Sequence, residues 1–410
     1  MFKKIILYLI QKRIGLASRL IKYFLITTDE IFQKDSKNTN ILYKEAESQI
    51  NIKPTDQSDV NLCYSKWIRN HKVKGQFLVS FENAFMVSEW AIPVTQEGEV
   101  ILETSGRFSQ LIGNLVSRTE TTQFAEYRLI FFLLKLKIFK LLRLKLNFKE
   151  KIISSLFHMV PRHGFSYNQG PTFSHWMFEN LPQVKMYNKT LQLDPETKLY
   201  IGKIRKDWQV LTLNLLGIKK NQIYEKKQPF ITKVSKLYIC KLPYIHSSEI
   251  IFDPEGRSWV NKTIRSSLKK GRYIQSIIQN KKENKIAFSR RFCSRRRLLN
   301  EEKYLNILKS KGYKIIYPEK INEIEKIDYS YSANIILGLP SGSALANFIY
   351  SDKPKLIEIQ DKKNLIPVWF LLSQELNMEY SLYFAEFYQN NNDFRENDLI
   401  LNDKNFLDDN

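Results

Sequence analysis

The segment Ile286-Ala-Phe-Ser-Arg-Arg-Phe-Cys-Ser-Arg-Arg-Arg-Leu-Leu-Asn-Glu-Glu302 begins as an apolar strand, passes through five arginines and then opens a helix. A guanidinium group can bind two phosphate oxygens at once, and the amides at a helix N-terminus supply further donors. The pattern therefore predicts a phosphate site at a strand end. A solvated basic loop is the alternative, and composition alone favours it in a lysine-rich chain. The alternation of strands and helices around the segment favours the phosphate site.

Length and charge limit the fold class and the partners. The 410 residues exceed one compact core, so we expect two domains with peripheral segments. The net charge of +22 indicates an anionic partner, and nucleic acid, a phospholipid surface, a nucleotide and an acidic glycan all fit. Part of this charge reflects a general abundance of lysine on solvated faces.

Motifs that bind metal ions are absent from the sequence. The three cysteines, Cys63, Cys240 and Cys293, lie far apart and form no C-x-x-C pair, and the five histidines have no H-E-x-x-H spacing. No two aspartates are two positions apart, so the D-x-D motif that many sugar-nucleotide enzymes use to hold a metal is missing. We therefore expect no metal and no cofactor, and phosphate charge would be met by Arg and Lys.

Two basic apolar segments raise the question of membrane contact. Residues 1–26 have an uninterrupted apolar run that is too short to span a bilayer, and no cleavage site typical of a signal peptide follows. A basic amphipathic helix on an anionic membrane surface and a helix packed on the protein itself fit equally well. The same two interpretations apply to residues 129–149. We expect a cytoplasmic protein that contacts the inner face of the membrane peripherally.

The domain organisation follows from changes in pattern along the chain. Residues 1–59 are interpreted as the amphipathic helix and a polar linker, the linker covering 35–59. Residues 60–270 are expected to form an N-terminal domain that begins with strands at 77–81, 84–87 and 100–104. Residues 271–385 are expected to form a Rossmann-like domain, and 386–410 a polar, acidic tail.

Strands and helices alternate from residue 197 onward. Strands are predicted at 198–202, 236–240, 285–288, 313–317, 334–337 and 356–359, and helices at 208–216, 259–280, 301–310, 321–331 and 344–350. This order predicts an α/β fold with a parallel, doubly wound sheet, whose ligands bind outside the carboxyl ends of the strands.

Three strand ends in the second half supply groups for one ligand. Ser289 and Arg290 end the first strand. The small-residue turn Gly338-Leu-Pro-Ser-Gly-Ser343 follows another, and its amides could approach a pyrophosphate closely, although a plain connection is the alternative. Glu358 could accept hydrogen bonds from a ribose diol or be a surface acid at a strand end. Because carboxyl ends of parallel strands meet at one edge, the three ends should converge.

A second cluster is Phe173-Ser-His-Trp-Met-Phe-Glu-Asn-Leu-Pro182. On a helix His175 and Glu179 share one face, so an imidazole and a carboxylate lie side by side and could take a proton from a hydroxyl. A buried His–Glu pair with a structural role is the alternative. Trp176 and Phe178 fit core packing better than a sugar-stacking platform.

These motifs together resemble glycosyltransferase family 61, which includes capsular-polysaccharide enzymes. Ser289-Arg290, five residues, Arg296, three residues and Asn300-Glu301 are similar to its central signature. The upstream motif is matched by His175-Trp176 with Glu179 and Leu181-Pro182, the intervening segment by Leu216-Gly217-Ile218, and the glycine-rich turn and last strand by Gly338 through Asn347 and Leu356-Ile-Glu-Ile359. The likeness runs from about residue 83 to 359.

The resemblance implies a fold, a reaction and a donor site. The fold would be GT-B-like, with two Rossmann-like domains facing a cleft. The reaction would be a metal-independent, inverting transfer from a nucleotide sugar to a surface glycan or a lipid-linked oligosaccharide, of the capsular, O-antigen or exopolysaccharide type, with His175 or Glu179 as the base. Donor-binding residues would be Ser289, Arg290, Arg296, Asn300, Ser341, Gly342, Ser343, Asn347 and Glu358.

Two positions depart from the family pattern. The family usually has G-P-H-G-A-G-L-A-N, whereas this chain has Leu339-Pro-Ser-Gly-Ser-Ala-Leu-Ala-Asn347, so that Ser341 replaces a histidine. Gln183 replaces the arginine that usually follows Leu-Pro. These changes imply a changed substrate or a weakened activity. The rival interpretations are a polyanion-binding protein without turnover, against which no RNA-binding motif is recognisable, and another GT-B-like enzyme such as a pyruvyl transferase.

Overall fold

The protein forms two compact units, each made of separate stretches of chain. The computed structural model describes residues 25–26, 38–87, 92–101, 132–139, 141–142, 152–159, 172–202, 204, 206–225, 231–245, 250–271, 285–339, 343–363, 365–388, 397–402 and 406. The first unit comprises Met1–Ala46, Gly75–Lys206 and Ile218–Leu242, and the second comprises Glu47–Lys74, Asp207–Gly217 and Pro243–Asn410. These units differ from the continuous domains that we expected, at 60–270 and 271–385.

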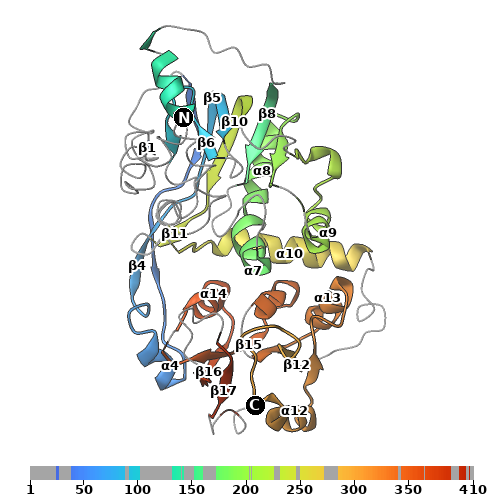
Figure 1. Cartoon of the computed structure of the whole chain (residues 1–410). Helices are drawn as coiled ribbons and strands as arrows, with labels where there is room; N and C mark the ends of the chain where they lie inside the picture. Colours follow the sequence, from blue (N-terminus) through green and yellow to red (C-terminus); the bar gives the residue numbers. More distant parts are fainter. Residues whose placement is uncertain are drawn as a thin grey trace, which may run out of the picture. The chain divides into compact units, whose positions relative to one another are not determined.

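The first unit is built on an eight-stranded mixed sheet. Its path runs β1-β7-β6-β5-β10-β8-β9, with β2 paired to β5. The strands are β1 (Leu25–Ile26), β2 (Thr39–Lys44), β5 (Phe77–Val87), β6 (Ile92–Val94), β7 (Val100–Ile101), β8 (Ile153–His158), β9 (Lys198–Tyr200) and β10 (Ile231–Lys241). Strands β5, β10 and β8 run side by side in Figure 1.

Only part of this sheet has the parallel pairing of a Rossmann-like domain. Strand β8 pairs in parallel with both β10 and β9, and helix α8 (Gln183–Leu193) lies between β8 and β9 in the chain. Strands β5, β6 and β10 pair antiparallel. The α/β class is therefore confirmed, but the first unit is a mixed sheet rather than a uniformly parallel one.

The two strands predicted at 77–81 and 84–87 form one strand, β5. The break in the sequence pattern falls at Asn83, whose φ of 54° places it in the left-handed region. Asparagine tolerates that conformation better than most residues, so the strand continues past it. Phe81 and Ala84, on either side of this break, are buried in the core of the unit, which also contains residues of β8 and β10.

One of the two basic apolar segments lies partly within the described residues. Residues 132–139 are helical, and Phe132, Leu133 and Leu136 are buried. The Phe132 ring makes an edge contact with Phe85, with centroids 5.4 Å apart. One face of this helix therefore packs on the first unit, as the core-helix interpretation predicted. The segment 1–24 lies outside the described residues.

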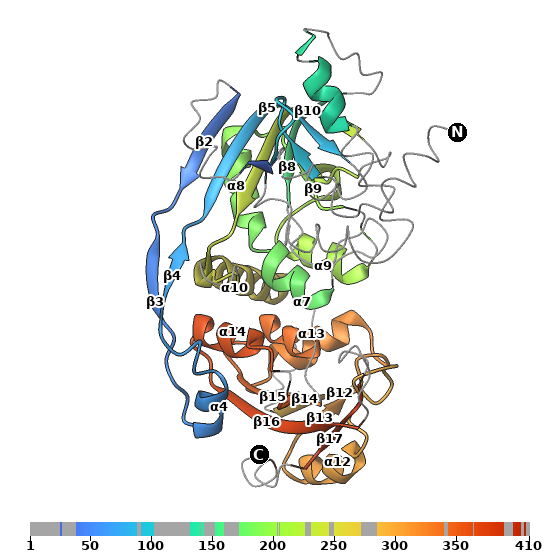
Figure 2. The ribbon, with the colours of Figure 1, turned by 60° about the vertical axis from the view of Figure 1, so that its left-hand side comes forward.

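The second unit contains a doubly wound sheet with the order β13-β12-β14-β15-β16-β17. The strands are β12 (Lys285–Ser289), β13 (Lys314–Ile316), β14 (Ile335–Leu339), β15 (Lys355–Asp361), β16 (Tyr380–Phe387) and β17 (Leu399–Leu401). The first five are parallel, and β17 pairs antiparallel with β16 (Figure 2). Counted along the chain, the parallel strands have the order 2-1-3-4-5. The topological switch point of this order lies between its first and third strands, β12 and β14.

Helices cover both faces of this sheet. Helix α12 (Glu301–Ser310) lies on one face, and α13 (Glu323–Tyr331) and α14 (Val368–Leu376) lie on the other (Figure 2). Local sequence explains their ends. Asn322 and Glu325 form a capping box at the start of α13, and Asn377 ends α14 in the left-handed conformation. Helix α12 has the bounds predicted from the sequence.

The predicted linker and the predicted tail both contribute to the second unit, although β2, inside the predicted linker, belongs to the first unit. The predicted linker 35–59 contains strands β2 and β3 (Ser48–Asn51), and β3 pairs with β4 (Asn70–Lys74) in a small sheet completed by β11 (Tyr244–Ile245). Residues 47–74, here called the N-terminal strap, also carry helix α4 (Ser58–Cys63). The predicted polar tail contributes β17 and the buried Phe406 to the core.

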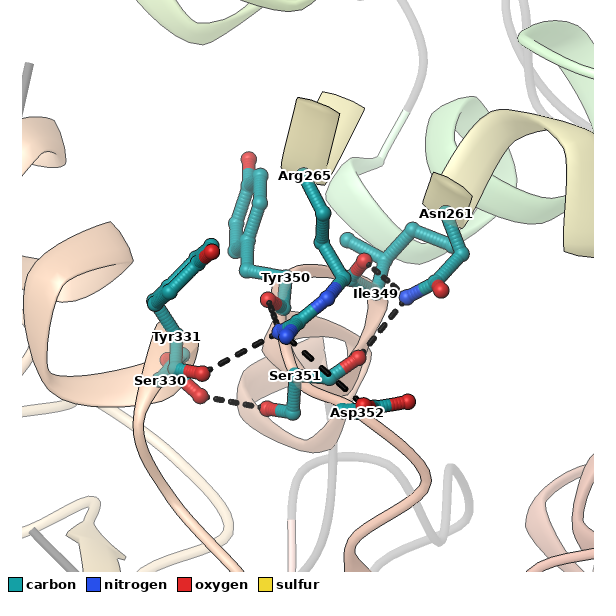
Figure 3. A network of polar contacts seen from close by, with 8 residues as sticks. All are labelled: Asn261, Arg265, Ser330, Tyr331, Ile349, Tyr350, Ser351 and Asp352. Carbon is teal, nitrogen blue, oxygen red and sulfur yellow. Dashed lines mark hydrogen bonds and ion pairs between the residues drawn. The ribbon is translucent and has the colours of Figure 1, made fainter. Parts of the chain in front are cut away.

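Helix α10 (Pro254–Gly271) is also part of the second unit. Asn261 donates to the carbonyls of Ile349 and Ser351, and Arg265 Nη1 donates to those of Tyr331 and Tyr350 (Figure 3). These carbonyls end α13 and the 3-10 helix η4 (Ser343–Tyr350), where the chain itself offers no donors. The contacts explain why the domain boundary expected at residue 270 does not separate this helix from the C-terminal sheet.

Candidate functional site

The strand ends singled out in the sequence meet at the carboxyl edge of the second sheet. Ser289 is level with Leu339 across β12 and β14, and Leu337 is level with Ile357 across β14 and β15. The amide of Arg290 extends the ladder by donating to the Leu339 carbonyl at 3.1 Å. The ends of β12 and β14 therefore meet as predicted, at the switch point between these two strands, whereas residues 340–342 of the predicted turn lie outside the described residues.

The loop after β12 is organised by its first arginine. The Arg290 guanidinium donates from Nε to the Arg296 carbonyl at 3.1 Å and from Nη2 to the Arg295 carbonyl at 3.2 Å. Arg296 has a φ of 56°, in the left-handed region. A non-glycine residue there is strained and persists only where its surroundings enforce it. The loop is therefore folded back on Arg290, and this residue has a structural role that the sequence did not indicate.

The arginines of this loop are not equivalent. Arg291 pairs with Glu302, and Arg297 binds Asp398 with 2.6 Å between Nη2 and Oδ2. Arg296 is half-buried, whereas these two are exposed. Burial lowers the pKa of Arg296, the charge of Arg290 lowers it further, and the charge of Glu358 opposes both effects. Two like charges are thus held together at the strand end, which is the electrostatic signature of an anion site.

Ser289 lies next to Glu301, in the first turn of α12. Its side chain is fully buried, and its hydroxyl accepts from the amide of Arg291 at 3.1 Å. Glu301, in the first turn of α12, is also buried; burial raises its pKa, and the Ser289 hydroxyl and the Arg291 charge oppose that shift. The sequence placed Glu301 in a motif without assigning it a role. A buried acid at a helix start next to a strand-end serine was the available signal.

Glu358 is a buried residue within its strand. Strand β15 continues three residues past it to Asp361, and Glu358 is only 2% exposed. Its Oε2 accepts a hydrogen bond of 2.6 Å from the Tyr380 hydroxyl. The interpretation as a surface acid at a strand end is therefore wrong. Tyr380 was missed because β16 was not predicted from the sequence.

The remaining predicted donor residues have varied surroundings. Asn300 exchanges two hydrogen bonds with the backbone of Leu401, so its amide holds β17. Asn347 is buried in η4; its Nδ2 donates to the Ala344 carbonyl at 2.7 Å, and in the structure its Oδ1 has no hydrogen-bond partner. Ser341 and Gly342, and the side chain of Ser343, lie outside the described residues.

In the first unit, the predicted pair is formed. His175 Nδ1 lies 2.9 Å from Glu179 Oε1. The chain passes from the short helix α7 (Phe173–His175) into a π-helical turn, η2 (Trp176–Asn180), so the pair is held on a wide turn. Such turns are uncommon and are frequent at functional sites. The His175 side chain is 34% exposed and that of Glu179 is 15% exposed, so the imidazole is accessible to a substrate.

Buried side chains next to this turn hold it in place. Trp176 is fully buried and Phe178 is 3% exposed, which confirms packing and rules out a sugar-stacking platform. Gln183, at the position where family 61 usually has arginine, is also buried. Its Nε2 donates to the Glu179 carbonyl at 2.8 Å, and its Oε1 accepts from the Cys240 thiol. Gln183 therefore fixes the turn that carries Glu179.

Within the described ranges, no group of three or more His, Cys, Asp or Glu side chains could hold a metal ion. All three cysteines are free thiols. Likewise, none of the helices in the described part of the chain is long and apolar enough to cross a membrane.

Comparison with known proteins identifies the region that contains both sites. A family model, described as Glycosyltransferase 61, matches residues 173–357. The match begins two residues before His175 and ends one residue before Glu358, and it includes the whole arginine loop. The resemblance to glycosyltransferase family 61 that was inferred from the motifs is thereby confirmed. No curated protein matches the chain.

Proposed function

We propose that the protein transfers a sugar from a nucleotide-sugar donor to a glycan acceptor, because residues 173–357 match the model of the glycosyltransferase 61 family. The donor diphosphate binds at the switch point of the second unit, and the acceptor hydroxyl is activated by residues of the first unit.

The observation that carries this proposal is the pair Arg290 and Arg296 at the carboxyl edge of β12 and β14. In the transfer, the acceptor oxygen bonds to the anomeric carbon while the bond from that carbon to the diphosphate oxygen breaks. Negative charge grows on the departing diphosphate. Two preorganised guanidinium groups stabilise that charge, and one such donor is worth about 10²–10³ in rate. Arginine thus supplies the charge that a metal ion supplies in other transferases, and the reaction is metal-independent.

The proton of the acceptor hydroxyl passes to the His175–Glu179 pair. A carboxylate 2.9 Å from Nδ1 favours the tautomer with its proton on that nitrogen, so that Nε2 carries the lone pair. The imidazole then acts as the base, and Glu179 stabilises the imidazolium that forms. Attack from the face opposite the leaving group inverts the anomeric carbon.

The acceptor class follows from the family and from charge. Family 61 includes capsular-polysaccharide enzymes, and a chain with a net charge of +22 suits acidic glycans, lipid-linked intermediates and an anionic membrane surface. We propose that the product is a surface polysaccharide and that the protein acts while it contacts the membrane surface peripherally. The exposed Leu141 and Leu142, which follow two exposed lysines, Lys135 and Lys137, support such contact.

Donor binding is tested with a panel of nucleotide sugars and thermal unfolding. A donor at 100 times its dissociation constant stabilises the protein by about 2.7 kcal/mol. Arg296→Ala should remove that shift, whereas Arg291→Ala, an exposed arginine of the same loop, should keep it. Equal losses of binding in both variants, together with an affinity that decreases steeply as the salt concentration rises, would instead favour a polyanion-binding protein.

The assignment of the base is tested separately. His175→Ala and Glu179→Gln should lower turnover by about 10²-fold or more while the donor still stabilises the protein. The buried Trp176→Phe is a control for damage to the turn. Equal loss of donor binding and turnover in the His175 variant would contradict a role confined to the proton transfer.

A further inference from the structure

The second unit contains a buried polar cluster next to the arginine loop. Tyr64, Glu358, Gln360 and Tyr380 are each at most 7% exposed. Tyr380 donates to Glu358, and Gln360 Nε2 donates to the Tyr64 hydroxyl at 3.0 Å. A buried carboxylate costs several kcal/mol unless it is paired and hydrogen-bonded. A strand that needed only to pack would carry an apolar residue at position 358, so the carboxylate requires a functional reason.

The register of the sheet gives the direction of this carboxylate. Ile357 and Ile359 belong to the core on the α12 side, and neighbouring residues of a strand face opposite ways. Glu358 therefore faces the other side, and because Leu337 is level with Ile357, it lies beside Gly338 at the switch point.

The charge of Glu358 acts on Arg296. The Arg296 guanidinium is half-buried beside Arg290, so both desolvation and like-charge repulsion drive it outward. The attraction of Glu358 is the opposing force. A guanidinium held in place before the ligand arrives loses less conformational freedom on binding than one that must be ordered by it.

We propose that Tyr380 is a positioning residue for donor binding, which orients the Glu358 carboxylate so that this carboxylate holds Arg296 in place for the donor diphosphate. Glu358 then acts on the phosphate end of the donor through Arg296, instead of contacting its ribose. The inference rests on the proposed function, because it requires a diphosphate at the arginine loop.

The N-terminal strap takes part in the same cluster. Tyr64 follows helix α4, its ring stacks on Phe370 with centroids 4.8 Å apart, and its hydroxyl reaches the Gln360 amide. Burial raises the pKa of Tyr64, and the charge of Glu358 raises it further, as expected for a phenol close to a buried carboxylate. The strap thereby supplies a buried, stacked tyrosine to the cluster that contains Glu358.

The decisive variant is Tyr380→Phe, which removes one hydroxyl and changes no charge. Binding is measured by calorimetry with UDP, GDP, CDP and dTDP and with the matching nucleosides. For the diphosphate that binds best, Tyr380→Phe should raise Kd about tenfold, equivalent to about 1.4 kcal/mol. The Kd of the free nucleoside should change less than twofold, because Arg296 contacts only the phosphates.

Two further variants separate positioning from general damage. Tyr313→Phe removes a buried hydroxyl from the core of the same sheet and should leave both affinities unchanged. In a Glu358→Gln background, Tyr380→Phe should add less than a twofold loss, because the group through which it acts is already gone.

The outcomes distinguish a failure of the positioning role of Tyr380 from a failure of the proposed function. Equal losses for the diphosphate and the nucleoside, or unchanged diphosphate binding in Tyr380→Phe, overturn the positioning role while leaving the proposed function standing. Tighter diphosphate binding by Glu358→Gln also overturns it, since Glu358 would then be only an opposing charge. A wild-type protein that binds none of the four diphosphates overturns the proposed function and this inference together.

Discussion

Replacing Arg265 by alanine should destabilise the second unit by about 3 kcal/mol. Its Nη1 donates to the carbonyls of Tyr331 and Tyr350 at 3.1 and 2.8 Å, and its guanidinium lies 4.4 Å from the centroid of the Tyr331 ring (Figure 3). Hydrogen bonds from charged donors contribute about 1.5–3 kcal/mol each, and we take the lower limit because the side chain is 20% exposed. The cation–π contact adds a smaller amount.

The ion pair of Arg265 provides the internal control. Asp352 lies 3.9 Å from Arg265 Nη2, and its side chain is 79% exposed, so Asp352→Ala should cost less than about 0.5 kcal/mol. Arg265→Lys keeps the charge but loses the planar fork and should cost about half as much as alanine.

Differential scanning calorimetry of the full chain measures the effect. For a unit of about 200 residues, each kcal/mol shifts Tm by about 2–4 °C, so Arg265→Ala should lower it by about 6–12 °C. The reasoning fails if Arg265→Ala melts within 2 °C of the wild type. It also fails if Asp352→Ala lowers Tm as much, because the surface pair would then matter more than the helix-end carbonyls.

Three other predictions follow from single contacts. Burial raises the pKa of the Glu375 carboxyl to about 8, above the pKa of the same group in the unfolded chain. The contribution of the protonated carboxyl to stability is therefore lost as the pH rises towards 8. The Tm of Glu375→Gln should vary less with pH than the Tm of the wild type. Gln183→Ala should lower turnover several-fold and stability by about 1–3 kcal/mol, with circular dichroism as the check that the fold persists. The double variant Leu141→Gln/Leu142→Gln should weaken binding to anionic liposomes several-fold. Leu62→Gln is the control, because Leu62 is a leucine in another part of the chain that is 74% exposed, and it should leave binding unchanged. Equal losses in the two variants would point to a general effect of polarity.

The sequence predicted the second unit better than the first, for a physical reason. Helix α12 and the strands at 285–289 and 335–339 carry their own start and stop signals and pack on neighbours that are close in the chain. The N-terminal strap has no such signal. It joins the second unit through contacts more than 290 residues away, such as that between Tyr64 and Gln360. Local patterns do not contain that information.

The candidate site divides in the same way. Residue types at a strand end located Arg290 and Arg296, and helical spacing located the pair His175–Glu179, because these positions depend on local periodicity. The function of each side chain within the site depended on distant partners. Asn300 fits a family motif, yet its amide is used by Leu401, 101 residues further on. A motif therefore located the site but could not distinguish its ligand contacts from its supports.

The arginine loop illustrates how charge becomes function. Two of its arginines, Arg291 and Arg297, bind acids of the protein itself, and Arg290 uses its Nε and Nη2 to hold two carbonyls of the loop. Their number therefore does not measure the strength of an anion site. Arg296 is different, because its strained backbone, partial burial and like-charged neighbour all cost free energy. Glu358 offsets only part of that cost, since burial and repulsion still leave the pKa of Arg296 below its ordinary value. The negative charge of a diphosphate would compensate the remaining free-energy cost of holding Arg296 in place, and this is the physical reason to place the donor there.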